Sequence, residues 1–157
     1  MVSFMSYEAR IEELGLEIPA APAPGGNYVP TKKIGKLVHT AGAICVQNGA
    51  MTHVGQVGGE RTIEEGYEGA KVCALNLLSA IKAEIGSLDN IEEFVSVSGY
   101  VNGVSGFPDS PAVVNGTSDL LLEIFGDAGK HVRAAVSVAG LPKNSTVEVQ
   151  CVVAIKE

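Results

Sequence analysis

Apolar residues return every three or four positions from residue 62 to residue 86, which is the spacing of an amphipathic helix. Thr62 and Glu65 stand at its start with the spacing of a capping box, in which each side chain satisfies a backbone N–H group of the first turn. Gly86 is a typical helix end. The sequence therefore predicts a long helix whose apolar stripe faces a core.

Two further segments have helical spacing. A second helix is predicted over residues 110–125, with Ser110 as its N-cap and Pro111 at the first helical position. Residues 6–15 predict a short helix near the start of the chain. A connector rich in Pro and Gly, residues 17–27, follows it without any periodicity.

Segments in which apolar and polar residues alternate, or in which apolar residues run together, predict strands. These segments are residues 28–31, 37–41, 43–46, 51–54, 94–101, 132–138 and 147–155. Asn48-Gly49 lies between the third and fourth of them and is the strongest dipeptide signal for a tight hairpin. Only the strand–helix–strand unit around residues 63–85 could form a parallel crossover, and the last two strands are expected to close the fold as a hairpin.

This order of elements predicts an α+β fold, with a mostly antiparallel sheet and two helices on one face. The 157 residues suit one domain, in which residues 1–25 form an N-terminal helix and a Pro-rich extension. A hydrophobic fraction of 46% against 18% charged residues excludes a disordered chain.

The net charge of −7 disfavours nucleic acid as a partner, because affinity for phosphates comes largely from Lys and Arg. Lys32, Lys33 and Lys36 form the one basic cluster, across a predicted turn. It is either a solvated turn or a local anion site, and the sequence leaves both open. No segment approaches the length of a membrane span, and the N-terminus lacks a long apolar stretch, so a cytoplasmic protein is expected.

The three cysteines, Cys45, Cys73 and Cys151, lack a C-x-x-C spacing and are expected to be buried free thiols. The three histidines, His39, His53 and His131, are scattered and form no metal-binding pattern. Neither a metal nor another cofactor is predicted.

Each closing strand carries one charge among small or apolar residues. Period-two alternation places Val132, Ala134, Val136 and Val138 on one face of the first strand, predicted to pack on the helices, and Arg133 on the other.

In the second strand Glu148 likewise leaves the apolar face. The two charges could form an exposed cross-strand ion pair worth less than about 1 kcal/mol. Ala135, Val152 and Ala154 are, however, too apolar for a fully solvated face, which suggests that another subunit covers it.

The segment RAAVSVAGLPKNSTVEV resembles the signature of the RidA/YjgF family, also labelled L-PSP endoribonuclease, which is roughly R-x-x-V-x-V-x-x-L-P-x-x-x-x-V-E-[IV]. GGNYVP, AGAI and VVNGTSDLLLEIFG are similar to three further family segments, the last to V-N-x-x-Y-x-x-F-F. The resemblance covers most of the chain after about Gly25, and the length is similar to that of the family's longer branch.

The resemblance implies a chorismate-mutase-like fold of the bacillus type that assembles as a homotrimer, with sites in the clefts between subunits. It also implies hydrolysis of reactive 2-imino or enamine acids to 2-oxo acids and ammonia. Arg133 falls on the arginine that holds the substrate carboxylate, and Glu148 on the glutamate that orients or activates water. Tyr28, Asn115 and Gly42 fall on residues that line the cleft.

Three positions depart from the family pattern. Ala41, Ala43 and Ala135 stand where short members usually place a hydroxyl, an amide and a thiol, and Ala43 and Ala135 are expected in the substrate cleft. This thinner polar lining suggests a larger or more apolar substrate than 2-iminopropanoate. A non-catalytic trimer that binds small carboxylic acids or a protein partner is the alternative, and the acidic balance makes a ribonuclease the least favoured interpretation.

Overall fold

A computed structural model of the chain describes residues 5–157, so the first four residues of the predicted N-terminal extension lie outside it. The elements in chain order are α1 (Tyr7–Glu13), β1 (Thr31–Ile34), β2 (Leu37–Thr40), β3 (Ala43–Ile44), β4 (Val46–Gln47), β5 (Ala50–Met51), α2 (Ile63–Ile85), η1 (Leu88–Asn90), β6 (Ile91–Asn102), α3 (Ser110–Phe125), η2 (Gly126–Gly129), β7 (Val132–Val138), η3 (Pro142–Asn144) and β8 (Val147–Ile155). None of these helices is long and apolar enough to cross a lipid bilayer.

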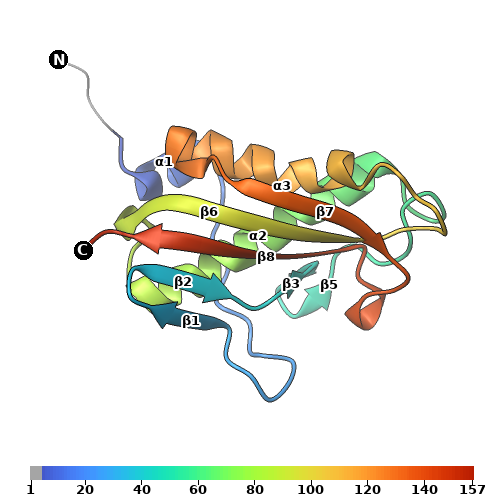
Figure 1. The fold of residues 1–157 in the computed structure, drawn as a ribbon, viewed down its shortest axis with the longest axis horizontal. Helices are drawn as coiled ribbons and strands as arrows, with labels where there is room; N and C mark the ends of the chain where they lie inside the picture. Colours follow the sequence, from blue (N-terminus) through green and yellow to red (C-terminus); the bar gives the residue numbers. More distant parts are fainter. Residues whose placement is uncertain (1–4) are drawn as a thin grey trace.

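One sheet carries the fold, with strands in the order β1-β2-β8-β6-β7 and β3 paired to β8. All its pairs are antiparallel except β6 with β7. The helices α2 and α3 pack against each other and against one face of this sheet, as Figure 1 shows. The predicted α+β architecture with a mostly antiparallel sheet is therefore confirmed.

The predicted closing hairpin is wrong, because β6 lies between β7 and β8. β6 and β7 run parallel and are joined by α3, since parallel neighbours need a long crossover and a helix of this length supplies it. The parallel crossover expected around residues 63–85 is likewise wrong. The strand before α2 belongs to the separate β4-β5 ribbon and does not pair with β6.

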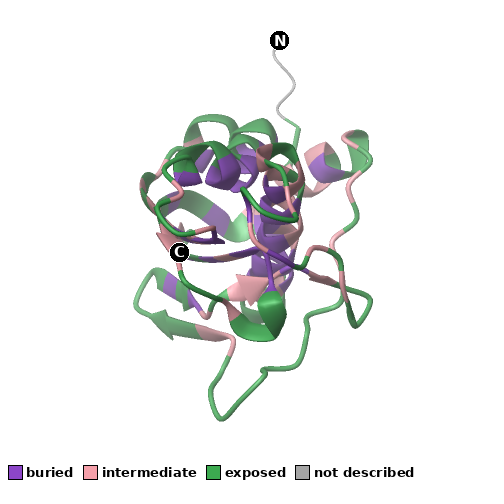
Figure 2. Cartoon of the chain, turned by 90° about the vertical axis from the view of Figure 1, so that its right-hand side faces the viewer, coloured by how far each residue is buried: buried purple, intermediate pink, exposed green. Residues whose placement is uncertain are grey.

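The core fills the space between the sheet and the helices, where the buried residues gather in Figure 2. The capping box of α2 forms as predicted, with Thr62 and Glu65 each bonding the other's backbone N–H. The three cysteines are buried and free, as expected. Cys45 and Cys73 lie 3.8 Å apart between their sulfur atoms, and this contact lowers the pKa of Cys45 to about 7.

Local turn chemistry accounts for several boundaries. Asn48 and Gly49 both have positive φ, which is the conformation that the tight β4-β5 hairpin requires. The first strand begins at Thr31 and not at residue 28, so Tyr28 lies in an irregular segment before it. Asp109 and not Ser110 is the N-cap of α3, and Ser110 is its first helical residue.

Gly116 allows α3 to lie directly on α2. A Cβ atom at this position would collide with the backbone carbonyl of Tyr67 in α2 and would press on Ala70. Thr117, the next residue, donates its hydroxyl to the Ala70 carbonyl at 2.6 Å. The two helices therefore meet through backbone, and this contact fixes the height of α3 above the sheet.

We expect Gly116→Ala to destabilise the protein by about 1–3 kcal/mol, because the new methyl group forces the helices apart. In an open helix the same change would stabilise by up to about 1 kcal/mol, so the sign of the effect is diagnostic. Urea unfolding measures it. Gly140→Ala is the control, since no atom lies within 4 Å of a Cβ built there; equal midpoints for both variants would contradict the close crossing.

Candidate functional site

The strand β7 presents two unlike faces. Val132 and Val136 are 70% and 46% exposed, whereas Arg133, Ala135 and Ser137 are half-buried. Arg133 reaches α3, so the polar face of β7 turns toward the helices and the apolar face away from them. The sequence prediction had the two faces of this strand reversed, because it assumed that apolar side chains face the helices.

The guanidinium of Arg133 is held against α3 from one side. Its Nη1 donates to Asn115 Oδ1 at 2.8 Å and to Ser118 Oγ at 3.0 Å. Its Nη2 makes a long contact of 3.5 Å with the carbonyl of Pro111. No hydrogen bond within residues 5–157 uses Nε, so the edge formed by Nε and Nη2 keeps N–H groups for a ligand. Arg133 and Asn115, both predicted as site residues, are thus in direct contact.

Sequence reasoning missed the hydrogen-bonded chain behind this guanidinium. Ser118 Oγ lies 2.8 Å from Nε2 of His131, and Nδ1 of His131 lies 2.6 Å from the carbonyl of Gly129. When Nδ1 carries the proton, Nε2 accepts the Ser118 hydroxyl, which leaves a lone pair of Ser118 for Arg133. The available signal was Ser118 itself, which stands at the tyrosine position of V-N-x-x-Y.

Glu148 lies on the other face of the sheet, in register with Tyr100 of β6 and Ile44 of β3. A Cβ atom on Gly42 would come within 2.6 Å of its Oε2, so only glycine lets the backbone approach this carboxylate. Burial raises the pKa of Glu148 above its usual value, because desolvation penalises the charged form. The position of Glu148 away from the helices agrees with the alternation of its strand.

The remaining predicted residues lie on different elements. Ala43 pairs with Val149, the residue next to Glu148 in β8. The N–H of Ala41 donates to the carbonyl of Pro30, two residues after Tyr28. The Tyr28 ring is 51% exposed and its hydroxyl accepts the Gly25 N–H at 3.2 Å. Ala135, in contrast, belongs with Arg133 on β7.

Within one chain the predicted residues therefore form two groups and not one. Arg133 aligns with Val97 of β6 and Glu148 with Tyr100, so three residue steps and two strand spacings separate them, about 14 Å between Cα atoms. The two side chains also leave the sheet on opposite faces. An exposed ion pair between Arg133 and Glu148 is excluded, and one subunit cannot bring both to one small ligand.

Within residues 5–157, α2 and α3 both cover the other face of the sheet, and no helix lies over the face that carries Glu148 (Figure 1). Strand register brings together several apolar side chains on it, some exposed and some half-buried: Leu37, Val132, Val136, Val152 and Ala154. The same register places Ser96 between Val132 and Val152, so the face is mixed, but exposed valine and leucine side chains on a sheet face are typical of a surface that another protein chain covers.

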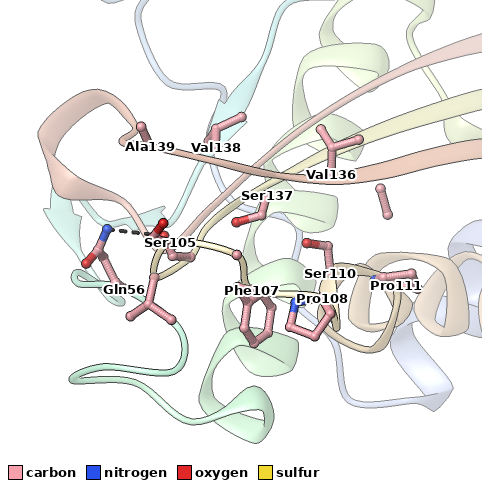
Figure 3. A pocket seen from close by; sticks show the side chains of 14 residues that line it. Gln56, Ser105, Phe107, Pro108, Ser110, Pro111, Val136, Ser137, Val138 and Ala139 are labelled. Carbon is pink, nitrogen blue, oxygen red and sulfur yellow. Dashed lines mark hydrogen bonds between the residues drawn. The ribbon is translucent and has the colours of Figure 1, made fainter.

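A groove of about 740 Å³ lies beside β7, between this strand and the loop that leads into α3. It is lined by Gln56, Gly103, Val104, Ser105, Gly106, Phe107, Pro108, Ser110, Pro111, Ala135, Val136, Ser137, Val138 and Ala139. Figure 3 shows Ser137 pointing from the strand toward Ser110 and Phe107, while Val136 and Val138 point the other way. Pro111 and Ala135 connect the groove to Arg133.

The described residues contain no cluster of three or more His, Cys, Asp or Glu side chains that could hold a metal ion. The two groups of site residues offer a fixed guanidinium, a carboxylate with a raised pKa and their polar neighbours. These groups can bind a carboxylate and can transfer a proton to or from water.

Comparisons with known proteins show the family of this chain. The profile of the family described as "YjgF/chorismate mutase-like, putative endoribonuclease" matches residues 8–155. Protein TCP17 of Trypanosoma cruzi is 38% identical over 146 residues, which cover 92% of this chain and 91% of that protein.

Solved structures show the same fold. A "putative endoribonuclease" from Shewanella oneidensis is 32% identical and superposes with a TM-score of 0.93 over 96% of this chain and 100% of that one. RidA from an Antarctic Psychrobacter is 24% identical, with a TM-score of 0.61 over 86% and 94% of the two chains, and at this identity it shows the shared fold alone. The chain belongs to the YjgF/chorismate mutase-like family.

Proposed function

We propose that this protein hydrolyses 2-imino acids, or the enamines from which they form, to 2-oxo acids and ammonia, at clefts between three identical subunits. The observation that carries the proposal is the guanidinium of Arg133, whose Nη1 is fixed by Asn115 and Ser118 while its Nε has no partner among residues 5–157. Such a held guanidinium suits a ligand that carries a carboxylate.

The substrate carboxylate would bind the free edge of Arg133. A planar guanidinium offers two parallel N–H groups to the two oxygens of a carboxylate, which fixes both position and orientation. Because Asn115 and Ser118 already hold Nη1, the side chain loses little further freedom when the ligand binds.

Glu148 would act as the general base. Its carboxylate takes a proton from water as the water oxygen bonds to C2 of the imine, and it returns this proton to the imine nitrogen to give a carbinolamine. The carboxylate then takes the hydroxyl proton of the carbinolamine and passes it to the nitrogen, the C2–N bond breaks, and ammonia leaves the 2-oxo acid behind. The raised pKa of Glu148 supports this role, because it brings the carboxylate closer to neutral pH as a proton acceptor.

Assembly would unite the two groups. Arg133 lies on an edge strand and Glu148 on the open apolar face, so a neighbouring copy can place its Glu148 near the Arg133 of the first. A closed ring of three copies repeats this contact and covers the apolar faces. Gly42 and Ala43, which lie on the Glu148 side, would complete the cleft together with Tyr28 and with Ala135 from the Arg133 side.

A trimer that binds small carboxylic acids or a protein partner without turnover is the second candidate. The alanines at positions 41, 43 and 135 favour it, because they offer no hydroxyl, amide or thiol to a reacting group. Both candidates predict carboxylate binding at Arg133, and only turnover separates them.

Arg133→Ala should lower imine hydrolysis at least tenfold, since a charge-assisted bidentate contact contributes about 1.5–3 kcal/mol. A threonine dehydratase with serine or threonine supplies the imine, and semicarbazide trapping follows its loss. Arg10→Ala is the matched control, because Arg10 pairs with Glu13 at the surface of α1. Equal rates for wild type and Arg133→Ala would contradict the proposed catalysis, and binding of 2-oxobutanoate without turnover would favour the second candidate.

A site shared between subunits should be restored by mixing two inactive variants. Co-expressed Arg133→Ala and Glu148→Ala chains, combined at random in equal amounts, should recover about a quarter of wild-type activity, because a quarter of the clefts then contain both intact residues. Mass measurement of the mixed oligomer checks the assembly. If both residues served one cleft from the same chain, mixing would restore nothing; a monomeric mass would overturn the shared cleft.

The raised pKa of Glu148 also predicts how stability changes with pH. The folded state binds this proton more tightly than the unfolded state, so the stabilisation is complete below pH 4.5 and is lost as pH rises through the raised pKa. The stability of Glu148→Gln lacks this pH dependence, so the variant should become more stable relative to wild type as pH rises above 4.5. Urea midpoints of both proteins from pH 4 to 8 test this, and a constant difference would contradict it.

A further inference from the structure

The groove beside β7 lies next to Arg133, where the carboxylate of the proposed substrate would bind. Nη2 of Arg133 lies 3.5 Å from the carbonyl of Pro111, and Pro111 is part of the groove wall. Ala135 is the next residue of β7 after Arg133 on the face toward the helices, and it lines the opposite wall of the groove. A ligand bound by Arg133 therefore has its remaining atoms at the mouth of this groove.

Three serines line the groove, Ser105, Ser110 and Ser137, and none of their hydroxyls has a hydrogen-bond partner among residues 5–157. Ser110 is 4% exposed, and none of the hydrogen bonds among residues 5–157 uses its Oγ or that of Ser137. Asp109 takes the N-cap position of α3, which leaves the Ser110 side chain free to point into the groove, as Figure 3 shows. Among residues 5–157 only Asn102 Oδ1 is a fully buried side-chain oxygen or nitrogen without a partner, so the Ser110 hydroxyl is open to the groove and can bond a ligand or water there.

The rest of the lining contains no charged residue. The ring of Phe107 forms part of one wall, and the amide of Gln56 is fixed at the far end by its 3.2 Å bond from Nε2 to the Gly103 carbonyl. An apolar wall with a few placed polar groups is the composition of a small-molecule site, and its volume lies within the range of about 300–1,000 Å³ for such sites.

We propose that this groove binds the side chain of the substrate, and that the substrate is a 2-imino acid with a long, uncharged side chain ending in a hydrogen-bonding group. The inference rests on the proposed hydrolysis at Arg133. Ser110 and Ser137 bond the terminal group, and Phe107 packs on the part between. The uncharged lining disfavours a side chain that ends in a carboxylate or an ammonium group.

The spacing along β7 sets the length of this side chain. Ala135 and Ser137 are successive inward positions, about 7 Å apart. The reacting C2 atom lies beside Ala135 when the carboxylate is on Arg133, so the terminal group lies about that far from C2. A para-hydroxybenzyl side chain has this reach, whereas the methyl group of 2-iminopropanoate leaves the groove empty.

The imines of tyrosine and phenylalanine test the proposal, because they differ by one hydroxyl group. A flavin-dependent L-amino-acid oxidase generates both, and semicarbazide trapping measures their loss. Wild type should show a kcat/KM about tenfold higher for the tyrosine imine, since a net hydrogen bond contributes up to about 1.5 kcal/mol. Ser137→Ala and Ser110→Ala should each reduce this preference to about threefold or less.

Binding of the two 2-oxo acid products by calorimetry gives a readout that does not depend on turnover. 4-Hydroxyphenylpyruvate should bind more tightly than phenylpyruvate, and Ser137→Ala should remove the difference. The groove proposal would be overturned if the two imines had equal kcat/KM values and the two 2-oxo acids bound with equal affinity. Hydrolysis of small imines in the same experiment would leave the proposed function standing. Selective binding without hydrolysis of any imine would support the groove as a side-chain site and sink the proposed hydrolysis.

Discussion

Strand β6 sets the relative position of Arg133 and Glu148. It pairs with β8 on one side and with β7 on the other, and each pairing fixes both a register and a face. Residues aligned with Val97 point toward the helices, and residues aligned with Tyr100 point away. A slip of one residue in either pairing would move Arg133 or Glu148 to the opposite face, so this register matters more to the site than any single contact.

The crossing of α2 and α3 is the second constraint, because α3 carries the groups that hold Arg133. Gly116 sits between Asn115 and Ser118 and lets the helix approach closely. The bonds from Arg133 to α3 in turn tie the edge strand to the helix layer. The site is thus a product of packing, and its geometry follows from backbone contacts that lie outside it.

Much of the fold could be predicted from local pattern, and the errors concern long-range pairing. Capping at Thr62, the turn at Asn48-Gly49 and the bounds of α3 depend on neighbouring residues, so the sequence contains them. Alternation in β7 also defines two faces from the sequence alone. It does not show which face the helices cover, because that depends on strand order and on what covers the apolar face. His131 was missed for the same reason, because its partner Ser118 lies thirteen positions away in the chain.

The placement of Arg133 and Glu148 on opposite faces has a consequence for dilute protein. A cleft completed by two subunits would exist only in the assembled state, so specific activity would fall as the protein concentration drops below the dissociation constant of the assembly. The activity of each molecule would then depend on how many others surround it. Cellular abundance would act on this protein as an effector does on an allosteric enzyme.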